Sequence, residues 1–379
     1  MIPRGGIRIG RIRGIEIFLH WSWFIIFFLL LWVVIQFFKV NVQSPAARYI
    51  PVAVVTTLLF FLSVLLHEMS HSVVANRNGV PIRRITLFVF GGVAQMSRDV
   101  TTPGVEFKMA IAGPLASYGL CITFGLAAYI AYVLKAGTVS FGFILLAAVN
   151  FGLGTFNLIP GFPLDGGRVL RSFLWRHSGN FEKSTRTASR LGEGLGGLLI
   201  ASGIAMIVLD LAAPQYNLML TGFWFILIGL FLFQAAVNSY RQVQIRTSLA
   251  NFGVRDLMRP GVPAVDASTT LEEAYRLHLQ NAPTSTIPVL QRGQLWGSIK
   301  LADLRSVEPS YWPDTPALQA AKPIGPSDAI DLEQPLFDAL MMMERSRRDF
   351  LWVTEDGRLA GVIFRDDARR MASDAGPPT

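Results

Sequence analysis

The sequence has little of what soluble or secreted proteins of its size usually contain. Cysteine occurs once in 379 residues, at Cys121 within an apolar run, which excludes an intrachain disulfide and a cysteine-based zinc site. Charged residues make up 16% of the chain and hydrophobic residues 51%, a balance that is rare in a soluble globular protein. Histidine is scarce as well, with five residues. These shortages exclude a disulfide-stapled scaffold and indicate a membrane protein.

The net charge of +8 fits the same interpretation. Arginines that flank membrane spans produce such an excess on an apolar chain. The sequence shows no interleaving of aromatic and basic residues and no groove-reading helix, the features that would argue for nucleic acid. We therefore expect no nucleic-acid partner.

Long apolar runs dominate the first 240 residues. The first run is longer than the core of a signal peptide, and no small-residue cleavage pattern ends it, so we expect an uncleaved first span. A bilayer requires a helix of about 20 apolar residues. The sequence predicts six transmembrane helices, near residues 17–38, 52–75, 107–134, 141–160, 195–213 and 218–238.

Basic residues alternate from one side of these spans to the other. Four arginines precede the first span, four lie between the second and third, and six basic residues lie between the fourth and fifth. The opposite side holds only Lys39, Arg48 and Lys135. Because Lys and Arg concentrate in cytoplasmic loops, both termini are expected in the cytoplasm, with the protein in a prokaryotic plasma membrane.

The composition becomes polar after about Tyr240, and two similar units of roughly 55 residues follow. The first combines a helix at 270–279 with strands at 286–290 and 297–299. The second combines a helix at 336–344 with strands at 350–353 and 361–363. Neither unit could bury its sheet alone, so a pair with one shared core is expected. The turns between the strands are predicted at Arg292-Gly293 and Asp356-Gly357.

The motif His67-Glu68-Met69-Ser70-His71 ends the second apolar run. On a helix, histidines four residues apart project from one face, so both imidazoles can bind one zinc ion. Glu68 stands beside them, placed to take a proton from the attacking water. Ionisable side chains at the end of a membrane span are costly unless they serve a function. The alternative is a pair of interfacial histidines with a glutamate that reaches the membrane surface.

Catalytic zinc requires a third protein ligand and one open position. Asp165 is the best candidate, because Pro160, Gly161 and Pro163 break the fourth span just before it. Non-helical backbone at membrane depth is tolerated where it is buried in protein or lines a wet cavity. The second and fourth spans run in the same direction, so Asp165 and the histidines fall at a similar depth. Taken alone, Asp165 would be read as part of an Asp-Gly turn after a helix.

In these motifs and their order, the chain resembles the site-2 protease family of intramembrane metalloproteases, in its six-span branch with a C-terminal pair of CBS modules. The resemblance implies one zinc ion per chain, held by His67, His71 and Asp165, with Glu68 activating water. It also implies that Asn157 helps to hold the substrate or the oxyanion, where a helix C-cap is the alternative role.

Two further segments carry the resemblance. Residues 88–96 look like the family's membrane-associated strand and Gly-Gly turn, whose edge could pair with an extended substrate. An interfacial hairpin with only a structural role is equally compatible with the sequence. Ala112-Gly113-Pro114 with Ser117 looks like the family's small-residue motif, for which helix packing is the favoured interpretation.

The CBS pair departs from the nucleotide-binding pattern in one respect. Modules that bind adenosine nucleotides usually carry a Ser or Thr three residues before an aspartate that holds the ribose. Asp303 and Asp367 keep the aspartate, but Lys300 and Phe364 stand where the hydroxyl would be. The sequence therefore leaves two alternatives open. The CBS pair binds an adenosine nucleotide, or it is purely structural or dimerising, so that the chain forms a homodimer through it.

The expected fold class is therefore a polytopic α-helical membrane protein of about six transmembrane helices with a cytoplasmic α/β CBS pair. The expected domains are residues 1–240 for the protease, 241–310 for the linker and first CBS module, and 311–379 for the second module and tail. The expected function is regulated intramembrane proteolysis by a zinc metalloendopeptidase that cleaves a transmembrane segment of a membrane-protein substrate within the lipid bilayer. The rivals are a catalytically inert relative and a metal transporter, although Glu68 argues against the first and the absence of an internal repeat against the second.

Overall fold

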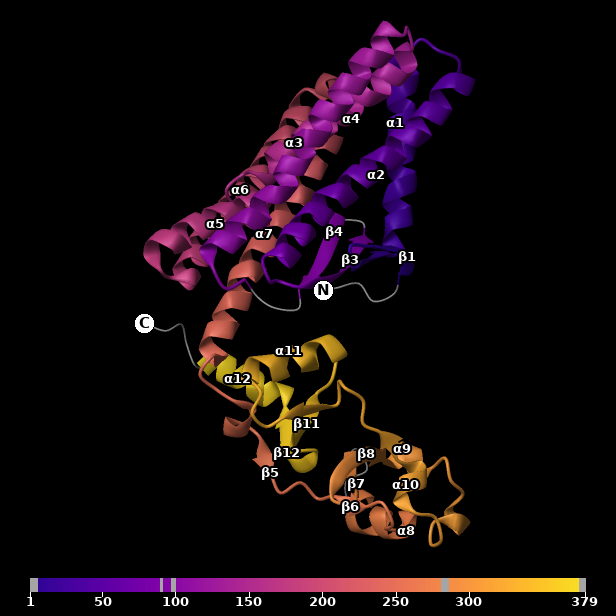
Figure 1. Cartoon of the computed structure of the whole chain (residues 1–379), viewed down its shortest axis with the longest axis vertical. Helices are drawn as coiled ribbons and strands as arrows, with labels where there is room; N and C mark the ends of the chain where they lie inside the picture. The colour runs from indigo at the N-terminus through magenta and orange to yellow at the C-terminus, as the bar shows by residue number, and fades with distance from the viewer. Residues whose placement is uncertain (1–5, 89–90, 97–99, 281–285, 375–379) are drawn as a thin grey trace. The chain divides into compact units, whose positions relative to one another are not determined.

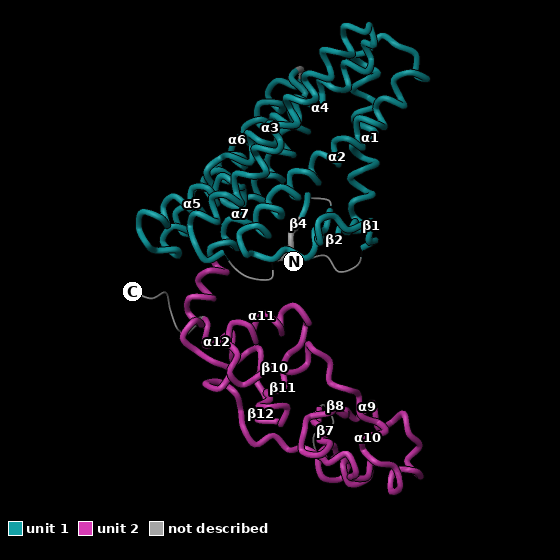
Figure 2. The backbone as a smooth tube through the Cα atoms, in the orientation of Figure 1, with its two compact units in different colours: residues 1–240 teal, residues 241–379 magenta. Residues whose placement is uncertain are grey.

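The computed structural model describes residues 6–88, 91–96, 100–280 and 286–374. It divides into two compact units, Met1–Tyr240 and Arg241–Thr379 (Figure 2). Figure 1 labels the helices and strands of both units. Each unit is considered by itself below.

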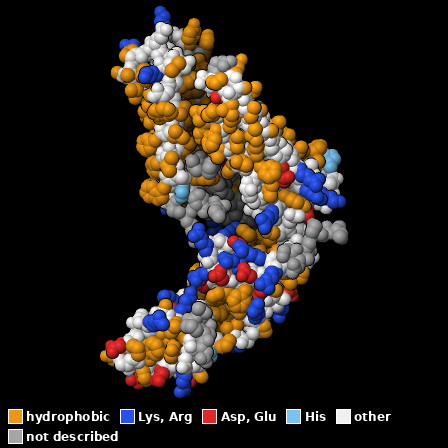
Figure 3. Space-filling view, turned by 180° about the vertical axis from the view of Figure 1, so that it is seen from behind, with side chains coloured by type: hydrophobic (Ala, Val, Ile, Leu, Met, Phe, Trp, Pro, Cys, Tyr) orange, Lys and Arg blue, Asp and Glu red, His pale blue; other side chains and the backbone are white. Residues whose placement is uncertain are grey.

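Among the described residues, six helices are long and apolar enough to cross a membrane; five lie in the first unit, and the sixth begins there and ends nine residues into the second. Their outer surfaces are largely hydrophobic (Figure 3), as expected for side chains that face lipid rather than water. The fold class predicted from the sequence is thus confirmed: the protein is a multi-pass membrane protein. The spans are α1 (Ser22–Asn41), α2 (Ala46–Arg77), α3 (Pro103–Val133), α4 (Gly137–Asn157), α6 (Phe181–Ala212) and α7 (Met219–Leu249).

Two features of the first unit differ from the sequence prediction. Residues 17–19, which were predicted as part of the first span, belong to a strand. Ile15 and Ile17 of this strand are buried in a sheet, and a count of apolar residues does not distinguish a buried strand from a helix. A short helix, α5 (Asp165–Ser178), precedes α6, and α6 itself begins 14 residues before the predicted span. Helix α5 and the first 14 residues of α6 are polar or amphipathic, so a search for apolar runs could not find them.

The small sheet lies at one end of the helices (Figure 1). Its strand order is β1-β2-β3-β4, with β2 and β3 parallel and the outer pairs antiparallel. Ile15, Ile17 and Ile85 pack with Met69 and Ala75 of α2, so the sheet is fixed to the helix that carries the histidines. The strands are β1 (Ile7–Ile12), β2 (Ile15–Leu19), β3 (Ile82–Phe88) and β4 (Gly91–Met96).

The second unit contains two four-stranded sheets, ordered β10-β11-β12-β5 and β6-β7-β8-β9. The predicted hairpin turns are present: Arg292 and Gly293 in one, and Asp356 and Gly357 in the other, all have positive φ, as two-residue hairpin loops require. The strands are β5 (Arg259–Pro260), β6 (Val265–Asp266), β7 (Thr286–Gln291), β8 (Gln294–Lys300), β9 (Lys322–Pro323), β10 (Ala329–Asp331), β11 (Phe350–Glu355) and β12 (Arg358–Phe364).

The two modules keep separate cores, contrary to the single shared core expected from the sequence. One core is centred on Leu336, Leu351 and Ile363, and the other on Leu271 and Ile299. The modules are joined instead through chain exchange, since β5 precedes the first module but pairs with β12 of the second. The helices are α8 (Leu271–Ala274), continued by a π-helix at Tyr275–Leu279, then α9 (Leu301–Leu304), α10 (Ala317–Ala320), α11 (Leu336–Ser346) and α12 (Arg365–Asp374).

Candidate active site

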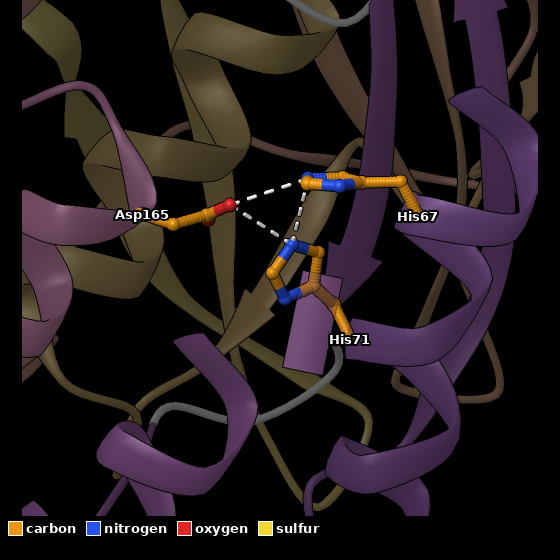
Figure 4. Close-up of side chains that lie close together, drawn as sticks. All are labelled: His67, His71 and Asp165. Carbon is orange, nitrogen blue, oxygen red and sulfur yellow. Dashed lines mark hydrogen bonds and ion pairs between the residues drawn. The ribbon is translucent and has the colours of Figure 1, made fainter. Parts of the chain in front are cut away.

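The two motif histidines lie on one face of α2, as their spacing predicts. His67 and His71 are buried, with 4% and 8% of their surface exposed. Their Nε2 atoms lie 3.3 Å apart and both face Asp165 (Figure 4). Asp165 Oδ2 lies 3.3 Å from Nε2 of His67 and 3.1 Å from Nε2 of His71. The structure therefore brings together the three residues that were expected to bind metal.

Asp165 reaches this position because α4 ends at Asn157, as the proline and glycine pattern predicts. The chain then folds back through tight turns, in which Gly161 N donates to Ile159 O and Leu164 N donates to Gly161 O, at 2.9 and 3.0 Å. Asp165 is the first residue of α5, so its backbone is fixed by the helix that follows.

The donor set fits a metal cation. Nδ1 of His71 lies 2.6 Å from the carbonyl oxygen of Met109, which can only accept, so Nδ1 carries the proton. The neutral form of His71 therefore has its lone pair on Nε2, the atom that faces Asp165, so a metal cation can take the place of the proton that otherwise lies between Nε2 and the carboxylate. Ligands on a tetrahedral zinc lie about 3.3–3.4 Å from one another, given Zn–N bonds of about 2.0–2.1 Å. The three observed separations agree with that spacing.

The charge state of Asp165 also suits a ligand. Burial raises the pKa of the Asp165 carboxyl, but hydrogen bonds and charges from His67 and His71 outweigh burial and hold the pKa well below its usual range. The carboxylate is therefore ionised and available as an oxygen ligand.

Glu68 and Asn157 line the same cavity, which has a volume of about 380 Å³. Glu68 lies directly against the start of β4, since a Cβ atom added to Gly92 would fall 2.9 Å from the carboxyl carbon of Glu68. Nδ2 of Asn157 donates to the carbonyl of Leu153 at 3.0 Å, within its own helix. Asn157 is the last residue of α4, and the C-cap is Leu158. Arg168 of α5 also lines the cavity, as a positive charge that the sequence did not single out.

Helix α3 contributes two residues that the sequence assigned to packing alone. Oγ of Ser117 lies 2.9 Å from Nδ1 of His67, so this hydroxyl orients the ring that offers Nε2 to the metal. Gly113 lies directly beneath both rings, where an added Cβ would fall 2.7 Å from Nε2 of His67 and would overlap His71. The small residue at position 113 therefore leaves room for the imidazoles.

The segment expected to bind a substrate strand is described in part. Residues 89–90 lie outside the described residues, as do residues 376–379 at the end of the expected tail. β4 runs from Gly91 to Met96 at one edge of the sheet, and Gly91 and Gly92 line the cavity beside Glu68. Among the described residues, β4 pairs only with β3, so an edge of the sheet begins beside the candidate base.

A second cavity of about 340 Å³ lies in the CBS pair, lined by residues of both modules. Asp303 accepts from the backbone N–H of Lys300 at 2.9 Å and forms an ion pair with Lys322. Thr286, directly opposite Lys300 in the β7–β8 ladder, supplies a hydroxyl to the cavity. Asp367 does not line this cavity and instead forms an ion pair with Arg259 at 2.6 Å. The two aspartates predicted as equivalent thus have different surroundings.

Comparison with known proteins identifies the family of each unit. Residues 55–136 and 125–196 match peptidase family M50, and residues 254–310 and 325–374 match CBS domains. The chain is 32% identical to Rip3 of Mycobacterium tuberculosis over 372 residues, 97% of this chain and 93% of Rip3. It is 32% identical to a zinc metalloprotease of Methanocaldococcus jannaschii over 367 residues, 97% of this chain and 96% of that protein.

A site-2 protease structure from Methanocaldococcus jannaschii is also similar, with 32% identity, 62% of this chain and 95% of that chain covered, and a TM-score of 0.39. The full-length relatives cover both the membrane helices and the CBS pair. The chain therefore belongs to peptidase family M50, the site-2 protease family of zinc metalloproteases, and carries a pair of CBS domains.

Proposed function

We propose that this metalloprotease cleaves a transmembrane segment of a membrane-protein substrate, with zinc held by His67, His71 and Asp165. One observation carries the proposal: the ligand atoms of these three residues converge beside Glu68 near the end of a membrane-spanning helix. One zinc ion per chain is expected, because the described residues contain a single such cluster.

When bound, the zinc ion supplies Lewis-acid chemistry, polarising the scissile carbonyl and lowering the pKa of a water molecule. Glu68 takes the proton from the attacking water and later passes it to the leaving amine, so that a peptide bond and water yield a carboxylate and an amine. Ser117 and the carbonyl of Met109 keep the two imidazoles turned toward Asp165 throughout.

The substrate must be unwound before cleavage, because a transmembrane helix hides its peptide groups in its own hydrogen bonds. We infer that an extended substrate segment pairs with the edge of β4, which begins beside Glu68. Asn157 lines the cavity, and we expect it to hold the substrate carbonyl after giving up its bond to Leu153.

The distribution of basic residues supports a location in the plasma membrane with both termini in the cytoplasm. In this orientation, cleavage near the cytoplasmic face would release a fragment inward, which is the pattern of regulated intramembrane proteolysis.

The proposal is tested with the purified full chain, zinc and a model transmembrane substrate in detergent. Glu68→Gln keeps the shape of the side chain but removes the base, so cleavage should fall by about a hundredfold to ten-thousandfold. Zinc content should stay at one per chain, because Glu68 is not among the three proposed ligands. Glu182→Gln, on the first turn of α6, serves as the matched control. A Glu68→Gln variant that cuts at the wild-type rate would overturn the assignment.

We further propose that the CBS cavity binds an adenosine nucleotide. The supporting observations are the carboxylate of Asp303 for the ribose, the hydroxyl of Thr286 that compensates for Lys300, and the aromatic rings of Phe350 and Trp352. A homodimer through the CBS pair stays a prediction, which size determination of the purified chain with and without nucleotide would test.

A further inference from the structure

One buried charge in the membrane unit has no part in the chemistry described above. Glu106, in the first turn of α3, has 0% of its surface exposed. Its Oε2 atom has no hydrogen-bond partner among the described residues. Burying a carboxylate is unfavourable unless it is paired, and even a paired one is often no more stabilising than apolar packing. Stability alone therefore does not account for Glu106.

The partners of Glu106 are two arginines of α5. Arg171 donates to Oε1 of Glu106 through Nε at 2.9 Å and also through Nη2. Nε of Arg168 lies 3.8 Å from the same oxygen. The guanidinium of Arg171 also lies over the rings of Phe162 and Phe181, at 4.8 and 4.6 Å. The carboxylate of Glu106 thus holds α5 against α3. Arg171 also contacts Phe162, which precedes α5, and Phe181, which follows it.

These arginines are close to the candidate metal ligand in the chain and in space. Asp165 opens α5, and Arg168 lies one turn further along and lines the same cavity. Phe162, which contacts Arg171, precedes Asp165 by three residues. A shift of α5 along α3 would therefore displace the carboxylate of Asp165 by a similar distance.

The same face of α3 also holds the other half of the site. Glu106, Met109, Gly113 and Ser117 follow one another at intervals of three, four and four residues, which places them on one side of the helix. Met109 and Ser117 contact His71 and His67, and Gly113 lies beneath both rings. One helix face therefore contacts the histidines of α2 at three positions and α5 at the fourth.

We propose that Glu106 is a positioning residue for the metal centre: by holding Arg171 and Arg168, it sets the position of Asp165 relative to His67 and His71. The inference rests on the proposed ligation of metal by these three residues. Functional groups must be held within about 0.5 Å of their working geometry. A buried ion pair is directional, so it adds a specific restraint on the position of α5 to that of the surrounding packing.

The test uses Co²⁺ in place of zinc, because the visible absorption of Co²⁺ reports the geometry of its ligands. The full chain is purified in detergent, stripped with a chelator and titrated with Co²⁺. For Glu106→Gln, we expect an altered absorption band and a Co²⁺ affinity lower by about tenfold to a hundredfold, the range found when residues behind metal ligands are changed. Arg171→Lys keeps the charge but loses the two-pronged contact, and should show a smaller change in the same direction.

Glu182→Gln is the matched control, since Glu182 occupies the first turn of α6 as Glu106 occupies that of α3. It should leave the spectrum and the affinity unchanged. The proposal is overturned if Glu106→Gln lowers only the melting temperature while spectrum and affinity stay as in the wild type. If Glu106→Gln does not fold, an unchanged Co²⁺ site in Arg171→Lys overturns it instead.

Failure of the proposed function would look different. A wild-type chain that binds no Co²⁺ overturns the metal assignment and this proposal together. A wild-type chain that binds one Co²⁺ ion but cleaves no membrane substrate overturns the proteolytic function. In that case the Co²⁺ spectra and affinities alone test the positioning role of Glu106.

Discussion

The catalytic cavity and the CBS cavity both gather ionisable side chains, but the charges are used in opposite ways. In the catalytic cavity, the ligand atoms of His67, His71 and Asp165 face one another. In the CBS cavity, Lys322 pairs with Asp303, and Arg348 pairs with Asp328. The first arrangement brings two imidazole nitrogens and a carboxylate oxygen together at one point, whereas in the second each of the two carboxylates already has a cationic partner, and Lys300 adds a further positive charge. The site formed by His67, His71 and Asp165 therefore attracts a metal cation strongly. A nucleotide in the CBS cavity would have to compete with the existing ion pairs.

The largest effect that tests this contrast is expected from Asp165→Ala. Removing the carboxylate leaves two imidazoles, too few for a catalytic zinc site. Zinc affinity should fall by well over a hundredfold, beyond the range seen for residues that only support ligands. Metal analysis of the purified chain after dialysis measures the loss. Asp165→Asn, which keeps an oxygen atom in place, should retain more metal, and full metal content in Asp165→Ala would show that the third ligand lies elsewhere.

A smaller effect is expected when the support of His67 is removed. Ser117→Ala deletes the hydroxyl that lies 2.9 Å from Nδ1 of His67, so the ring loses its orienting contact. Zinc affinity should fall by about tenfold to a hundredfold. Competition with a chromogenic chelator measures the change. Thr123→Ala, which removes a hydroxyl bonded only to its own helix at Gly119, is the matched control on α3. Equal affinities in Ser117→Ala and wild type would mean that packing alone holds His67.

The smallest effect is expected in the CBS cavity. Asp303→Asn keeps the bond to the backbone of Lys300 but loses the charge, so AMP affinity should fall by about tenfold, as for one hydrogen bond to a charged group. Isothermal titration of the full chain with AMP gives the affinity. Asp367→Asn is the control from the second module, since Asp367 does not line the cavity. A wild-type chain that releases no heat with AMP would contradict nucleotide binding and leave a structural pair.

The sequence predicted that His67 and His71 lie on one face of a helix, because the relation between these two residues is local. Four residues on a helix place two side chains on one face whatever surrounds them. The proximity of Asp165 to these histidines required a further inference about topology, and the turns after Asn157 bring Asp165 to that position. The contacts of Ser117 and Glu106 could not be predicted, because they depend on how α3 packs against α2 and α5.

The fold shows the same division between local and long-range information. Hairpin turns such as Asp356-Gly357 were predicted, because positive φ is a property of those residues themselves. The exchange of β5 into the sheet of the second module was not, because it joins Arg259 to Val362 across about a hundred residues of chain. The separate cores of the two modules were also missed, because core membership depends on packing between residues distant in the chain.

The orientations of the two imidazoles depend on different kinds of partner, a side chain for His67 and the main chain for His71. His67 depends on a side chain, Ser117, so a single nucleotide change in one codon can remove its support. His71 depends on the main-chain carbonyl of Met109, which every amino acid at position 109 would supply. Substitution of the supporting residue can therefore loosen His67 but not His71. When variants at these two positions are compared, losses of metal affinity should occur at position 117, while position 109 should tolerate any side chain that fits the space.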